Sequence, residues 1–291
     1  MLRMLRSALA LLLLPISSGA DVFDDGQIHD VDFAIGTPSF VRDDGGGAPT
    51  TVNLIAGASG HEIQIEDASV LNVFDGATIQ FPDYTLASRG AVCGGSLTQL
   101  DVVGSADVEV SGGTFTNGPS QPVRTTGGTL VIQGGSFENT ASLATKVALS
   151  LGGGTAEVRG GTIVDGAVSI GPTVQATLSG GSLGSDGITT VSGGSLTIVG
   201  TSFNLPFGAI VGAYNGPLTG TLADGSALTT TLVKGASSPV ELVHGTQGPP
   251  TSAVCSLAPQ VPLLPTWAAA LAGVSLGGAG AALLGARLRR L

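Results

Sequence analysis

The carboxylates of Glu109 and Glu157 come nearest, in this 291-residue sequence, to a pattern that could do chemistry. Both stand at the same position of a recurring phrase, and glycosidases need two such groups, ~5–5.5 Å apart for retention or ~6.5–9.5 Å for inversion. Val131 holds that position in the copy between them, which predicts a separation of two strand spacings, roughly 9.6 Å. No basic residue is assigned beside them, so we interpret both as solvated charges and expect no catalytic residue.

The other residues with chemical potential also lack a recognisable pattern. His29, His61 and His244 are widely separated in the sequence, so a Ser-His-Asp arrangement has no support. The densest carboxylates match no calcium-binding loop, and we interpret them as a solvated acidic surface. They are Asp24, Asp25, Asp30, Asp32, Asp43 and Asp44. The sequence therefore indicates no metal site and no cofactor.

Charge and composition restrict the class of protein. All 21 Asp and Glu residues lie between Asp21 and Glu241, together with six Lys and Arg residues, which gives this stretch a net charge of −15. Such a surface repels nucleic acid and anionic lipid and attracts divalent cations or basic partners. Glycine reaches 47 residues, yet hydrophobic residues make up 42% of the chain, and that hydrophobicity argues against disorder.

An apolar-x-apolar-x-Gly-Gly-Ser/Thr-apolar phrase recurs along the middle of the chain. Its clearest copies are Val108–Phe115, Leu130–Phe137, Ala156–Ile163 and Ala176–Leu183, and weaker ones are Phe74–Ile79, Val92–Leu97 and Ile198–Phe203. A period of about 20 residues with apolar-polar alternation is typical of one coil of a parallel β-helix. We therefore expect an all-β, single-stranded parallel β-helix, a solenoid of about eight coils. A sandwich with Gly-rich turns is the alternative, but it gives no reason for similar inward residues at one fixed phase.

The alternation also predicts which side chains face inward. One inward column contains Val110, Ile132, Val158, Leu178 and Ile198, and a second contains Phe115, Phe137, Ile163, Leu183 and Phe203. The outward column contains Glu109, Val131, Glu157, Thr177 and Thr197. The Gly-Gly steps are expected at the corners, where a tight bend and positive φ suit glycine.

Both ends of the chain carry targeting signals. Arg3 and Arg6, an apolar run over 8–14 and small residues ending at Ala20 are typical of a secretory signal peptide cleaved after Ala20. Residues 266–286 contain no charge and are long enough to cross a bilayer. The arginines that follow belong on the cytoplasmic side, which leaves the middle of the chain outside. They are Arg287, Arg289 and Arg290.

These features divide the chain into segments. Residues 1–20 are the signal peptide, 21–50 an N-terminal cap, 51–244 the β-helix repeats with a C-terminal cap, 245–260 a linker, and 261–291 a C-terminal sorting signal or transmembrane helix. Cys93 and Cys255 are the only cysteines, and in an oxidising compartment they allow one disulfide that ties the tail to the third repeat. Free thiols and pairing in trans are the alternatives.

The last 31 residues resemble the tripartite PEP-CTERM class of sorting signals. The proline motif is Val261, Pro262 and Pro265, with leucines where that class carries an acidic residue, and the apolar helix with Trp267 and the basic tail follow. The resemblance implies recognition by an exosortase-type membrane peptidase and delivery to the cell surface or extracellular matrix. Simple retention as a membrane anchor is the alternative.

The whole layout is similar to bacterial exported Gly-rich β-helix proteins that carry such a tail. Leu71–Gly76 and Pro49–Leu54 are the closest matches to their repeat phrase. We expect an exported, membrane-sorted structural or adhesive protein of the cell envelope without catalytic activity, with a surface polysaccharide as a candidate partner and no nucleic acid. The alternative is a carbohydrate-active or carbohydrate-binding β-helix protein.

Overall fold

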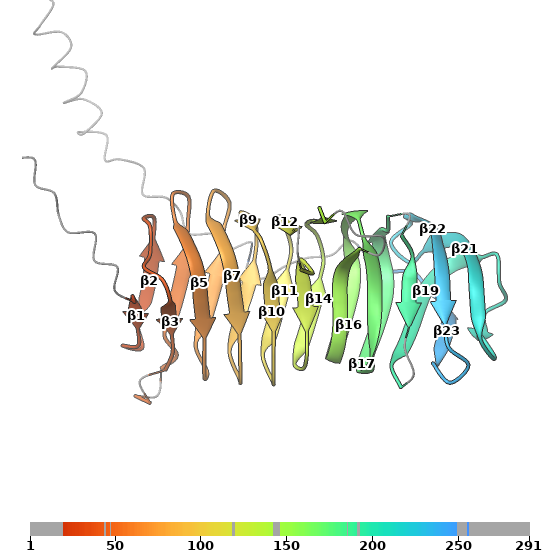
Figure 1. Cartoon of the computed structure of the whole chain (residues 1–291), viewed down its shortest axis with the longest axis horizontal. Coiled ribbons are helices and arrows are strands. Elements are labelled where there is room, and N and C mark those ends of the chain that lie inside the picture. Colours follow the sequence, from red (N-terminus) through yellow and green to blue (C-terminus); the bar gives the residue numbers. More distant parts are fainter. Residues whose placement is uncertain are drawn as a thin grey trace, which may run out of the picture. The chain divides into compact units, whose positions relative to one another are not determined.

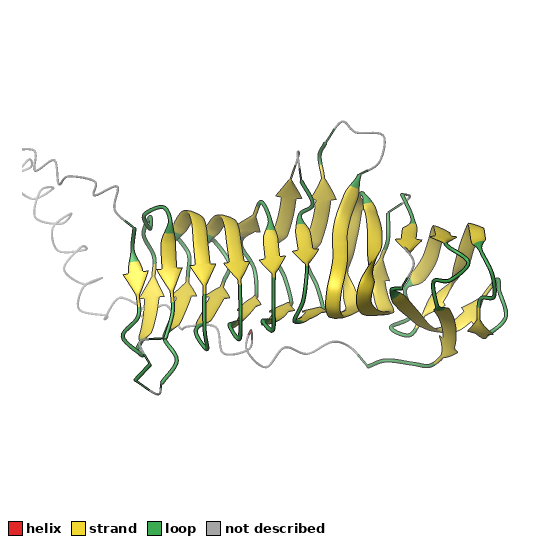
Figure 2. Ribbon diagram, turned by 60° about the horizontal axis from the view of Figure 1, so that its bottom comes forward, coloured by secondary structure: helices red, strands yellow, loops and turns green. Residues whose placement is uncertain are grey.

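The structure is a computed structural model that describes residues 20–43, 45–46, 48–117, 120–141, 146–184, 186–190, 193–248 and 255. Within these residues the chain is an all-β parallel solenoid of about eight coils without an α-helix (Figures 1 and 2). The predicted fold class is therefore confirmed for this part of the chain. The chain divides into two units, Met1–Leu257 and Ala258–Leu291, and every described residue belongs to the first.

Each coil contributes short strands to three faces, and apart from the C-terminal end these strands pair in parallel with those of neighbouring coils. The first face carries the copies of the repeat phrase before their glycines. Its strands are β2 (Ile28–Val31), β4 (Thr51–Leu54), β6 (Val70–Val73), β8 (Arg89–Val92), β11 (Asp107–Val110), β14 (Thr129–Ile132), the middle of β16 (Val147–Asp165) and of β17 (Ala167–Ser182), the start of β19 (Ser195–Phe203), and β23 (Val240–His244).

The second face follows the glycines. Its strands are the starts of β5 (Ser59–Ile65) and β7 (Thr78–Tyr84), β9 (Ser96–Leu97), β12 (Thr114–Asn117), β15 (Ser136–Asn139), and the ends of β16 and β17. The third face completes each coil. It consists of β1 (Val22–Phe23), β3 (Ser39–Val41), the ends of β5 and β7, β10 (Leu100–Val102), β13 (Val123–Thr125), the starts of β16 and β17, β18 (Ile188–Thr190), and β22 (Ala227–Lys234).

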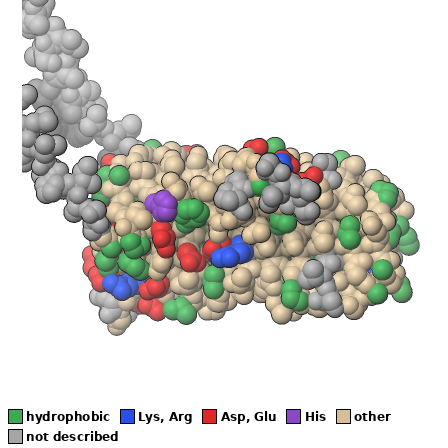
Figure 3. Space-filling model, viewed as in Figure 1, with side chains coloured by type: hydrophobic (Ala, Val, Ile, Leu, Met, Phe, Trp, Pro, Cys, Tyr) green, Lys and Arg blue, Asp and Glu red, His purple; other side chains and the backbone are tan. Residues whose placement is uncertain are grey.

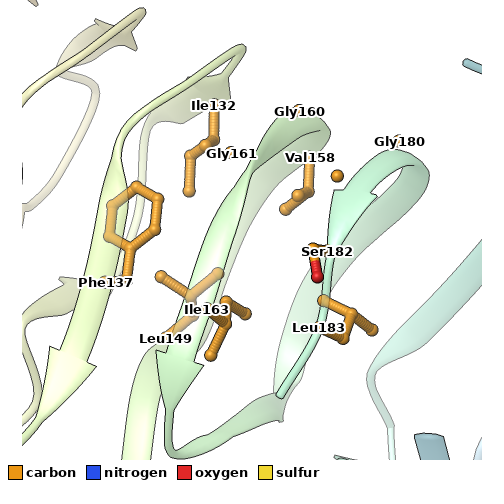
Figure 4. A pocket seen from close by; sticks show the side chains of 11 residues that line it. Ile132, Phe137, Leu149, Val158, Gly160, Gly161, Ile163, Gly180, Ser182 and Leu183 are labelled. Carbon is orange, nitrogen blue, oxygen red and sulfur yellow. The ribbon is translucent and has the colours of Figure 1, made fainter. Parts of the chain in front are cut away.

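The predicted inward column of the first face is confirmed. Val110, Ile132, Val158, Leu178 and Ile198 are register partners in successive coils, and all five are buried. Figure 4 shows Ile132 and Val158 pointing into the interior toward Phe137, Leu149 and Ile163. The space that these side chains enclose has no room for a water molecule, so this part of the interior is a packed core rather than a ligand pocket.

The second inward column is confirmed in part. Phe115, Phe137 and Ile163 are register partners, and the first two rings stack with centroids 4.8 Å apart. Leu183 and Phe203 are only partly buried against the core. Phe203 departs from the predicted parallel stack, because the end of β19 pairs in antiparallel fashion with β21 (Tyr214–Leu222), where Phe203 meets Gly220.

Each Gly-Gly step forms a corner between the first and second faces, as predicted. The second glycine has positive φ, +91° at Gly113 and +94° at Gly135, which side chains rarely adopt. The first glycine is required by close approach, since a Cβ on Gly134 would lie 2.2 Å from the carbonyl oxygen of Ser111 in the preceding coil. The two glycines therefore serve different purposes, one in the turn and one in coil-to-coil contact.

The C-terminal end of the solenoid is closed by an antiparallel hairpin. Strands β21 and β22 pair along eight register positions, and β20 (Gly208–Ala209) pairs in antiparallel fashion with β23. At the other end, β1, β2 and β3 stack directly on the coil that follows them. Antiparallel strands end the parallel stacking, as the end of a solenoid requires.

A disulfide joins Cys93, just after β8, to Cys255, and closes a loop of 162 residues. Earlier in the chain than Cys255, the backbone N–H of Gln247 donates to the carbonyl oxygen of Ala223 at 2.8 Å. The Gln247 side chain accepts a hydrogen bond from the Ser179 hydroxyl. Ser179 lies four coils beyond that of Cys93. Gln247 and Cys255 thus attach to the solenoid at two places about 19 Å apart along its axis, at ~4.8 Å per coil.

Candidate functional site

The outward surface of the third face carries one polar side chain per coil. Gln64, Asp83, Asp101 and Arg124 are successive register partners on β5, β7, β10 and β13. Ser150, Ser169 and Thr189 continue the same column. Because paired strands lie ~4.8 Å apart, the face presents a straight polar ladder parallel to the solenoid axis. We call this column of seven residues the polar ladder.

Asp101 accepts hydrogen bonds from two strong donors, Arg124 and Gln99. The Arg124 guanidinium donates from Nε to Oδ1 at 3.1 Å and from Nη2 to Oδ2 at 2.7 Å, and the Gln99 amide donates to both oxygens at 3.0 and 2.9 Å. This two-point contact fixes the orientation of both side chains. The Asp101 side chain is 13% exposed, so the pair forms a rigid element of the surface.

Asp83, directly beside it, has the opposite environment. Its carboxylate is half-buried, and its Oδ1 accepts no hydrogen bond from any residue in the described part of the chain. Burial raises the pKa of Asp83, and the neighbouring charge of Asp101 raises that pKa further, while Arg124 acts against both. An ionisable group in such a position is a candidate for a functional role.

A groove of about 310 Å³ lies over these strands. Its lining is His61, Glu62, Phe81, Pro82, Asp83, Gln99 and Asp101. His61 is exposed and meets the edge of the Phe81 ring, with centroids 5.1 Å apart. Figure 3 shows acidic side chains gathered on this face below a histidine and beside a basic side chain. The groove combines carboxylates, the Gln99 amide and an aromatic wall.

The chemistry available to this groove is hydrogen bonding and charge pairing. Asp83 and Asp101 lie on neighbouring strands, ~4.8 Å apart at the backbone, which is close to the spacing of carboxyl pairs in retaining glycosidases, ~5–5.5 Å. Burial and the neighbouring charge of Asp101 also raise the pKa of Asp83, as is typical of the acid in such a pair. Both carboxylate oxygens of Asp101, however, already accept hydrogen bonds from Arg124 and Gln99.

The predicted carboxylates of the first face lie in the predicted register. Glu109, Val131 and Glu157 are successive partners, so one coil separates the two acids. Glu109 accepts a hydrogen bond from the Ser111 hydroxyl at 3.0 Å, and Glu157 pairs with Arg159. Arg159 is a basic neighbour that the sequence had not placed there. A depression of about 430 Å³ includes Glu109 and Val131 but not Glu157.

Within the described residues, which do not include Asp44, the histidines and the N-terminal carboxylates do not gather into one site. His29 on β2, His61 on β5 and His244 on β23 belong to separate coils. His29 pairs with Asp25 at 2.8 Å, which lowers the pKa of that carboxyl, and Asp30 accepts from the Asn53 amide. Among the described residues, no three His, Cys, Asp or Glu side chains are placed to hold a metal ion.

The predicted targeting residues fall at the edge of the described residues or outside them. Ala20 is described and exposed. The sorting-signal residues lie outside the described residues: Val261, Pro262, Pro265, Trp267, Arg287, Arg289 and Arg290. In the described part of the chain, no helix has the length and hydropathy needed to cross a membrane.

Sequence reasoning missed the groove because it followed only the residues immediately before and after the glycines of each copy. Gln64, Asp83 and Asp101 each lie seven residues after the first glycine of their copy, at Gly57, Gly76 and Gly94. That constant offset was a usable signal. Arg124 lies twelve residues after Gly112 because a longer connection intervenes, and the register with Asp101 is visible only in the structure.

Comparisons of the chain with protein-family models, with curated proteins and with solved structures gave no match.

Proposed function

We propose that this chain is an exported protein that serves, without catalysis, as a structural or adhesive component of the cell surface or extracellular matrix. The observation that carries the proposal is the continuous coil-to-coil register, which makes the described part a stiff body with ordered outward columns. Repetitive stacking of this kind offers extended binding surfaces. The signal-like N-terminus and the tail at 261–291 support an envelope location.

The tail is proposed to act as the sorting signal of an exosortase-type peptidase, with plain membrane anchoring as the alternative. Intact-mass measurement on surface material distinguishes the two. Cleavage near Pro262 and Pro265 removes Trp267 from the mature chain, whereas an anchor retains it. Protease added to whole cells should degrade residues 21–255. Complete protection in intact cells, with degradation only after lysis, would contradict an external location.

A carbohydrate-active function is the second candidate, because Asp83 and Asp101 are neighbours with contrasting environments. The test is release of reducing ends from acidic and neutral glycans by the full chain. Our proposal expects none. Release that disappears in Asp83→Asn and Asp101→Asn, and persists in Glu109→Gln and Glu157→Gln, would replace the structural proposal with an enzymatic one.

A further inference from the structure

We propose that the groove and polar ladder of the third face bind a linear polysaccharide bearing free amino groups, laid parallel to the solenoid axis. This inference rests on the proposed adhesive function and names the class of ligand. Three features of the described residues lead to it: the spacing of the ladder, the charge of the groove and its aromatic wall.

The ladder matches a polymer with a short repeating unit. From Gln64 to Thr189, one polar side chain per coil faces outward, and the coils advance by ~4.8 Å. Sugar rings in an extended chain advance by a similar step, so successive rings can meet equivalent positions of successive coils. A partner whose side chains are irregularly spaced makes fewer equivalent contacts with successive coils.

The charge of the groove selects a cationic hydrogen-bond donor. Glu62, Asp83 and Asp101 line it, and the guanidinium of Arg124 is already bound to Asp101 in a two-point contact. Asp83 contributes a half-buried carboxylate to the lining of the groove. An ammonium group supplies hydrogen-bond donors and the opposite charge to this acidic lining, and such charge-assisted hydrogen bonds are the strong ones.

The wall of the groove suits a sugar ring. Phe81 and Pro82 line it, and the ring of His61 stands at the edge of the Phe81 ring. A pyranose ring has an apolar face that stacks on such surfaces while its edge groups hydrogen-bond. A basic peptide satisfies the charges as well, but the regular ladder beyond the groove favours the polysaccharide.

The test measures binding to the full chain in detergent by calorimetry at mildly acidic pH, where hexosamine amino groups are protonated. The probes are a glucosamine oligomer, its fully N-acetylated counterpart of equal length, and oligolysine of equal charge. The site variant is Glu62→Gln with Asp83→Asn. The matched control is Asp107→Asn with Glu109→Gln on the first face, which removes the same charge from another groove. Thermal melting shows that each variant is folded.

The glucosamine oligomer should bind the wild-type chain and the first-face control equally, and bind the site variant roughly tenfold or more weakly, as expected for two lost charge-assisted contacts. Equal weakening in both variants would overturn the site, because nonspecific charge then explains binding. Equal affinity for the N-acetylated oligomer or for oligolysine would overturn the ligand class. If cells bearing the chain still adhere while the purified chain ignores the oligomer, this inference fails and the adhesive function stands.

Discussion

Asp83 on β7 and Asp101 on β10 are register partners on neighbouring strands, yet only one of the two carboxylates is satisfied. Arg124 and Gln99 donate to both oxygens of Asp101, whereas Asp83 has an oxygen without a partner among the described residues. The same Asp-to-Asn substitution should therefore have opposite effects on stability at the two positions.

Asp83→Asn should raise the melting temperature at neutral pH. The pKa of Asp83 is raised in the folded state, so the folded chain holds this proton more tightly than the unfolded chain, and stability falls as pH rises past the unfolded value of about 3.8. Asn does not ionise, so the variant does not lose this stability as the pH rises. Melting curves of both proteins between about pH 3 and pH 7 should converge at the acid end, and a variant less stable than wild type at neutral pH would contradict the assignment.

Asp101→Asn should lower stability at neutral pH by about 1 kcal/mol, because the Arg124 side chain is 46% exposed and such surface pairs contribute little. Urea unfolding of the two Asn variants side by side provides the comparison. Stabilisation by both substitutions would mean that the whole patch is simply too negative, independent of the Arg124 contact.

Ile132→Asp should destabilise the solenoid by about 4 kcal/mol or more, because it places an unpaired charge in the inward column. Thr197→Asp faces outward beside its register partner Glu241 and should cost about 0.5 kcal/mol through like-charge repulsion. Thermal melting of the two variants separates these costs. Similar losses in both would show that the inward and outward columns are wrongly assigned.

Gly134→Ala should cost about 1–3 kcal/mol, because the new Cβ meets the carbonyl oxygen of Ser111 and forces adjacent coils apart. Gly248→Ala is the matched control, since nothing lies near a Cβ at that position. Denaturant midpoints of the two variants report the difference. A silent Gly134→Ala would mean that the first glycine of the phrase has no role in stacking.

Reduction of the Cys93–Cys255 disulfide should lower the free energy of unfolding by about 5 kcal/mol in the chain-entropy treatment of a 162-residue loop. The double variant Cys93→Ser with Cys255→Ser should unfold at the same denaturant concentration with and without reductant. A wild-type chain that is equally stable in both conditions would show that the bond does not constrain the tail.

The sequence allowed prediction of the first face and much of the second, because the Gly-Gly phrase marks one corner in every coil. The third face could not be aligned in the same way, since the connection before Arg124 is longer than the one before Asp101. The position of Phe203 could not be predicted for a different reason. Its apolar type and phase suit an inward column, but no further parallel coil follows, and β19 pairs with the hairpin strand β21 instead.

Deletion of residues 261–291 tests the central claim of an exported, membrane-sorted solenoid most directly. Arginines at 287, 289 and 290 after an uncharged segment are costly to move across a bilayer, about 2.5–3.5 kcal/mol each at its centre. Fractionation of cells producing the full and the shortened chain should therefore show the shortened chain released in soluble form, with an unchanged melting temperature. Unchanged association of the shortened chain with the membrane would contradict the claim.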